Sequence, residues 1–83
     1  MNQTMKIESN KMKLDNKSIE ELKQIFIVGN KFDGYYGNGT PSGLKVVTKV
    51  SESSCWINGG RNSWNTIKDY CNNGIYRTTE SDN

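Results

Sequence analysis

The sequence predicts a small α+β fold that is partly disordered, with an amphipathic N-terminal helix, a short antiparallel β-region and a disulfide-stapled C-terminal helix. Three observations predict it: helical spacing of apolar residues over 18–28, an alternating strand over 44–50, and a cysteine at either end of 55–71. Only 33% of the 83 residues are apolar, so the chain forms at most one domain with a modest core. We therefore expect much of it to be mobile in water.

The N-terminal third divides into an extension and a helix. Residues 1–17 are polar and lysine-rich, which is typical of a disordered segment. Ser18 and Glu21 then make a capping box, and Gly29-Asn30 ends the helix because both residues tolerate the left-handed conformation. The helix carries an apolar stripe of Ile19, Leu22, Ile25 and Phe26. That stripe packs either on the chain's own core or in a groove of another protein.

The middle of the chain predicts a hairpin. Its turn signal is Tyr35-Tyr36-Gly37-Asn38-Gly39, since Asn-Gly is the dipeptide best suited to a type I′ turn. Residues 44–50 form the best strand, which can pair with residues 32–36. Its alternation predicts an apolar face and a basic face, formed respectively by Leu44, Val46, Thr48 and Val50 and by Lys45, Val47 and Lys49.

The last third predicts a second helix. Asn58-Gly59-Gly60 breaks the apolar patch Cys55-Trp56-Ile57, and Asn62 or Ser63 can cap the helix that follows. Asn72-Asn73-Gly74 ends it, and residues 75–83 form a polar, frayed tail. One face of this helix carries Trp64, Ile67, Tyr70 and Cys71.

The two cysteines and the aromatic residues each allow two interpretations. A Cys55–Cys71 disulfide would contribute about 3 kcal/mol by closing the loop between them, whereas reduced thiols would simply be buried as small apolar groups. Trp56, Trp64 and Tyr70 suit a membrane–water interface, and they equally suit a small core.

Composition excludes several classes of function. The chain has no His and two Cys, so we expect no metal site, no cofactor and no catalytic constellation, and we predict that it is not an enzyme. A net charge of +2, spread along the chain, argues against a nucleic-acid partner. The longest apolar run, residues 25–28, is too short for a spanning helix or a general secretory signal.

Three segments carry a resemblance to a known family. Tyr35-Tyr36-Gly37-Asn38-Gly39 resembles the YGNG signature of class IIa (pediocin-like) bacteriocins, and residues 53–60 are similar to that family's second-cysteine segment. Residues 18–25 resemble the amphipathic part of the leaders on such precursors. The chain departs from the family in lacking a cysteine shortly after YGNG, and in having Gly29-Asn30 where leaders end in Gly-Gly.

The resemblance implies a precursor with a leader over 1–30 and a mature peptide over 31–83, cleaved near Gly29-Asn30 and secreted. The leader stripe would be recognised by a processing and export transporter. The YGNG region would bind a membrane receptor, a sugar-uptake permease in the family, on related Gram-positive cells. The helical part would then permeabilise the target-cell membrane, and a cognate immunity protein would protect the producer.

Two other hypotheses remain open from the residues. One is a modified-peptide precursor, in which dehydrated Ser and Thr form thioether rings with the two cysteines and the product loses mass in multiples of one water. The other is a small non-secreted interaction protein, in which the amphipathic helix binds a partner and the YGNG match is coincidence.

Overall fold

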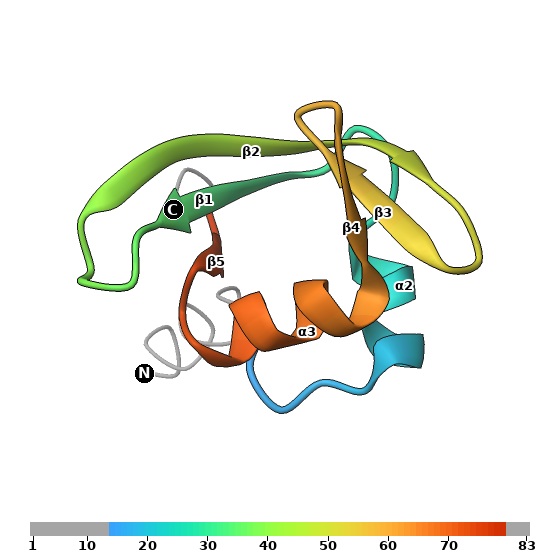
Figure 1. Cartoon of the computed structure of the whole chain (residues 1–83), viewed down its shortest axis with the longest axis horizontal. Helices are drawn as coiled ribbons and strands as arrows, with labels where there is room; N and C mark the ends of the chain where they lie inside the picture. The colour runs from blue at the N-terminus through green and yellow to red at the C-terminus, as the bar shows by residue number, and fades with distance from the viewer. Residues whose placement is uncertain (1–13, 80–83) are drawn as a thin grey trace, which may run out of the picture.

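The computed structural model describes residues 14–79, which form two layers. One layer is a five-stranded antiparallel sheet with strand order β4-β3-β2-β1-β5, and both helices lie on one of its faces (Figure 1). The elements are α2 (Ile19–Ile25), β1 (Lys31–Tyr35), β2 (Pro41–Val50), β3 (Ser54–Ile57), β4 (Gly60–Ser63), α3 (Trp64–Asn72) and β5 (Tyr76–Thr78). The predicted fold class is therefore wrong, because a five-stranded sheet, and not a short β-region beside helices, organises this part of the chain.

Both helices begin where the sequence indicates. Ser18 caps α2 and forms the full capping box with Glu21, and the Ser63 side chain accepts a hydrogen bond from the Thr66 N–H at the start of α3. α2 is shorter than predicted, since it ends at Ile25, and Gly29 has a φ of 96° in the connection that follows. Local capping chemistry was thus sufficient to predict both helices.

β2 is the longest strand and connects the two halves of the sheet. Its first part pairs with β1 and its last part with β3, with an irregularity between Val47 and Lys49. The predicted pairing with residues 32–36 is confirmed, but the predicted faces are wrong. Val47 is only 1% exposed and points to the helices, whereas Leu44 is 50% exposed. Because Val46 and Val47 are consecutive, either face of β2 could be the apolar one. Val47 faces the core because it stands opposite the buried Ile57 on β3.

The type I′ turn lies at a different Asn-Gly pair from the predicted one. Asn58 and Gly59 join β3 to β4 with φ values of 52° and 85°, the positive values that a type I′ turn needs. In the β1–β2 connection, Gly39 has a positive φ but Gly37 and Asn38 do not, and the Gly39 N–H donates to the Tyr36 carbonyl at 2.9 Å. That geometry is a type I turn followed by a glycine bulge.

Both predicted disordered ends contain ordered residues. Leu14 is buried in the core, although residues 1–17 were expected to be an extension. Tyr76–Thr78 form β5 on the outer side of β1, where a frayed tail was expected. The rest of those two segments, residues 1–13 and 80–83, lies outside the residues that the structure describes.

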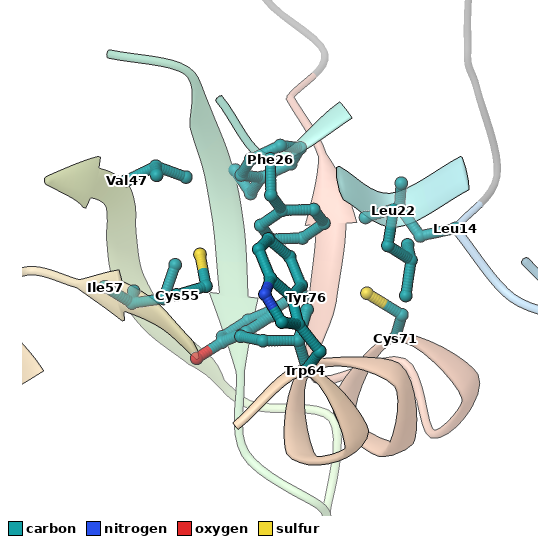
Figure 2. Packing of buried hydrophobic residues seen from close by; sticks show 11 residues of the cluster. Leu14, Leu22, Phe26, Val47, Cys55, Ile57, Trp64, Cys71 and Tyr76 are labelled. Atoms are coloured by element: carbon teal, nitrogen blue, oxygen red, sulfur yellow. The ribbon is translucent and has the colours of Figure 1, made fainter. Parts of the chain in front are cut away.

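The core lies between the sheet and the helices (Figure 2). Phe26 is fully buried at its centre, stacked on Phe32 with ring centroids 4.1 Å apart and 6.0 Å from Tyr76. Leu22 is also fully buried, and Ile19 and Ile25 pack against the cluster. The apolar stripe of α2, together with the C-cap residue Phe26, therefore packs in the chain's own core.

Candidate binding surface

The face of the sheet opposite the helices carries half-buried and exposed side chains, apart from the buried Ser54. Alternation along each strand defines it: Phe32, Val47, Ile57 and Tyr76 point to the core, so their strand neighbours point away. We call this surface the open face. Its members are Lys31, Asp33, Tyr35, Leu44, Val46, Lys49, Trp56, Arg61 and Arg77.

A row of one aromatic and two cationic side chains crosses β2, β3 and β4. Trp56 stands opposite Lys49 on one side and opposite Arg61 on the other. The Lys49 Nζ lies 4.6 Å from the centroid of the Trp56 ring, a cation–π contact. Arg61 is held beside the ring because its Nε donates a 3.1 Å hydrogen bond to Oγ of the buried Ser54. We call these three residues the Trp56 row.

A second cation–aromatic contact lies at the far end of the open face. The Arg77 guanidinium carbon is 3.8 Å from the centroid of the Tyr35 ring. Arg77 is also held by the backbone, since its Nε donates a 2.8 Å hydrogen bond to the Gly74 carbonyl. Its cross-strand neighbour is Asp33 on β1. We call Tyr35 and Arg77 the Tyr35 pair.

Charge is unevenly divided between the two faces. The open face carries four cations, Lys31, Lys49, Arg61 and Arg77, against the single carboxylate of Asp33. The helices carry both signs, at Glu20, Glu21, Lys23, Lys68 and Asp69. The prediction from sequence treated the charge as evenly dispersed, because these cations are far apart in the chain and only strand register brings them to one surface. Alternation was the available signal for the other cations, but Lys49 reaches this face only through the irregularity between Val47 and Lys49, which alternation does not predict.

The predicted receptor-binding motif occupies the β1–β2 hairpin. Tyr35 lies in β1, where its ring contacts the Arg77 guanidinium, and Tyr36 is 61% exposed at the start of the turn. Gly37 and Gly39 have open space where a Cβ would be, and Asn38 Oδ1 accepts a hydrogen bond from the Thr40 N–H at 2.9 Å. The turn is thus held by its own hydrogen bonds without a disulfide.

The predicted membrane-interface residues do not share a surface. Trp56 lies on the open face, whereas Trp64 is buried and its Nε1 donates a 3.0 Å hydrogen bond to the Ser51 carbonyl. Tyr70 packs edge-on against Tyr76, with ring centroids 5.4 Å apart. Within residues 14–79, no helix has the length and apolar character that crossing a membrane requires.

Both cysteines are buried free thiols, so the predicted Cys55–Cys71 bridge is absent from the structure. Burial raises the pKa of the Cys55 thiol to about 11. Burial, with a smaller effect from Cys55, raises the pKa of the Cys71 thiol to about 12. Protonated, inaccessible thiols are poor nucleophiles and poor metal ligands. In the described part of the chain, no three Cys, Asp or Glu side chains gather in a way that could hold a metal ion.

The predicted cleavage region is integrated into the fold by backbone hydrogen bonds. The Gly29 N–H donates to the Val47 carbonyl at 2.9 Å, and the Val47 N–H donates to the Asn30 carbonyl at 3.0 Å. These bonds extend the β1–β2 pairing backwards past Lys31. A peptide bond in such a segment must be released from its neighbour before a protease can bind it as an extended strand.

Fold and surface together define a class: a small two-layer domain in which helices cover one sheet face and aromatic–cation contacts occupy the other. Comparison with protein-family models, with curated proteins and with solved structures finds no match to the chain.

Proposed function

We propose that the intact chain is a non-enzymatic interaction protein that binds an anionic polymer through its open face. The observation that carries the proposal is the collection of four cations and one carboxylate on a single sheet surface, beside two half-buried aromatic rings. Clustered charge of one sign raises the local concentration of an oppositely charged partner and accelerates its association. The raised pKa values of both thiols also favour a binding role over nucleophilic catalysis.

The binding element in this proposal is the sheet and not the amphipathic helix. Leu22 and Phe26 are fully buried, so a partner that took up the helix stripe would have to remove them from the core. The open face needs no such rearrangement, because its side chains already contact solvent. The proposal therefore agrees with the interaction-protein hypothesis, but it assigns binding to the open face of the sheet and not to the amphipathic helix.

Retention on heparin, a flexible polyanion, tests the proposal. Lys31→Gln/Lys49→Gln removes two exposed charges from the open face, while Lys17→Gln/Lys23→Gln removes two charges from the helix layer as a matched control. We expect the first variant to elute at clearly lower salt than the unaltered chain and the control to elute close to it. Equal shifts in the two variants would show that only net charge matters, and would contradict the proposal.

The secreted-peptide hypothesis is the second candidate, and the exposed YGNG turn at the hairpin tip is the observation that favours it. It ranks second because cleavage after Asn30 would remove Leu22 and Phe26 from the core on which Phe32 packs. Its test is whether purified residues 31–83 inhibit Gram-positive indicator strains. Inactivity at micromolar concentration across a broad panel would argue against it.

A further inference from the structure

We propose that the anionic polymer is single-stranded nucleic acid, with bases stacking at Trp56 and at the Tyr35 pair while the neighbouring cations contact phosphates. This inference rests on the proposed function and specifies its ligand. It differs from the expectation drawn from net charge, because the structure concentrates cations and rings that the sequence separates.

The combination of rings and cations is what favours nucleic acid among polyanions. A polysaccharide sulfate or polyphosphate needs only positive charge. Single-stranded nucleic acid offers phosphates and unstacked bases, and proteins bind it with basic grooves and aromatic stacking platforms. The Trp56 row supplies one ring between two cations, and the Tyr35 pair supplies a ring with a guanidinium plane against it. Guanidinium planes are themselves stacking surfaces for bases.

The two platforms are pre-organised by the fold. Arg61 is tethered to the buried Ser54 hydroxyl, and Arg77 is tethered to the Gly74 carbonyl. Trp56 and Tyr35 lie on paired strands, and each ring contacts a cation. Their side chains therefore have less conformational freedom to lose on binding. Lys49 is exposed and has a long side chain, so its ammonium can move from the Trp56 ring to a phosphate when a base takes its place.

The spacing of the platforms suits a strand of several nucleotides. Tyr35 stands opposite Pro41 and Trp56 stands opposite Lys49 on the same strand, β2. The distance between those positions along β2 is at most about 26 Å at ~3.3 Å per residue, and less where the strand bends. Lys31, opposite Val46, lies between them and can contact the intervening backbone. A ligand too short to connect the platforms should bind more weakly.

Two other anionic partners fit this surface less well. A duplex keeps its bases stacked inside, so the rings could not reach them and only the cations would contribute. An anionic membrane is bound by apolar side chains that insert below the headgroups. Trp56 is half-buried and stands between Lys49 and Arg61 on the neighbouring strands, so its ring is not part of a continuous apolar surface that could insert in this way.

The test is a titration of the full 83-residue chain with fluorescein-labelled dT12, followed by anisotropy and repeated at several salt concentrations. Trp56→Leu removes the ring, and Trp56→Phe keeps one. We expect Trp56→Leu to weaken dT12 binding by about 5- to 150-fold, the usual range for losing one base-stacking ring, and Trp56→Phe to lose much less. Lys31→Gln/Lys49→Gln should reduce the slope of log affinity against log salt by about 1.4, or 0.7 per contact.

Parallel titrations with a 12-bp duplex, heparin and phosphatidylglycerol vesicles separate the outcomes. Tighter binding of dT12 than of dT4 and of the duplex, with heparin binding unchanged in Trp56→Leu, supports the inference. Binding of dT12 that is indifferent to both Trp56 variants overturns it and leaves the proposed function standing. Preference for vesicles overturns it in favour of a membrane. Absence of binding to every polyanion overturns the inference and the proposed function together.

Discussion

Phe26→Ala gives the sharpest check on whether the amphipathic segment belongs to the core. Phe26 is fully buried and stacks on Phe32 at 4.1 Å, so truncation removes a large side chain and one aromatic contact. Such changes cost about 3–5 kcal/mol. A domain of 83 residues has a free energy of unfolding of about 4–12 kcal/mol, so the variant should lose a quarter or more of its stability.

Urea denaturation measures this loss, with fluorescence of the buried Trp64 as the probe. Ile27→Ala is the matched control, because Ile27 is the next residue and is 50% exposed, so we expect it to cost less than about 1 kcal/mol. Equal, small losses in both variants would refute the reasoning. They would mean that Phe26 does not pack in the core and that its stripe is available to another protein.

Three further predictions concern the turns, the buried titratable groups and a helix cap. Asn58→Ala should cost about 2–3 kcal/mol in urea denaturation, since it removes two hydrogen bonds to β2 and a residue suited to positive φ. Asn38→Ala, at the other Asn-Gly pair, should cost about 1 kcal/mol, because it removes one hydrogen bond at negative φ. Burial raises the pKa of Cys71 and of Tyr76 to about 12 each, so the unfolded chain releases these protons first. Stability should be complete below about pH 9 and should fall as the pH rises towards 12, which urea midpoints at pH 8 and 10.5 would detect. Ser18→Ala should cost about 1 kcal/mol by removing the cap of α2, and an unchanged midpoint would contradict the capping box.

The sequence predicted the elements that depend on neighbouring residues. Both helices begin at the expected serines, Ser18 and Ser63, because a cap is a local hydrogen-bond pattern. The β1–β2 pairing was likewise within reach, since a turn signal lies between two strand-like segments. These are the parts of the fold in which local and tertiary preferences agree.

The features of the fold that were predicted wrongly depend on contacts between segments far apart in the sequence. β5 and Leu14 look like polar tails in the sequence, and only pairing with β1 and packing on the core order them. Which of the two adjacent valines in β2 faces the core depends on the register with β3, where Val47 stands opposite the buried Ile57. The strands β3 and β4 were not predicted, because each is too short to show a clear pattern of alternation.

The binding surface was the least predictable feature. Trp56 and the YGNG motif were recognised as unusual, but the cations that accompany them come from separate strands. Treating the charge as dispersed is correct along the chain and incorrect on the folded surface. The aromatic set also divides, because Trp64 enters the core while Trp56 stays on the open face.

The two tryptophans therefore provide the most direct test of the account. In a ¹⁵N-labelled full-length chain, each indole N–H gives its own signal, and heparin or dT12 can be added until binding is complete. We predict that the Trp56 indole signal moves while that of Trp64, hydrogen-bonded to the Ser51 carbonyl in the core, stays in place. Bound polymer with a stationary Trp56 signal, or with the larger shift at Trp64, would contradict a binding site on the open face.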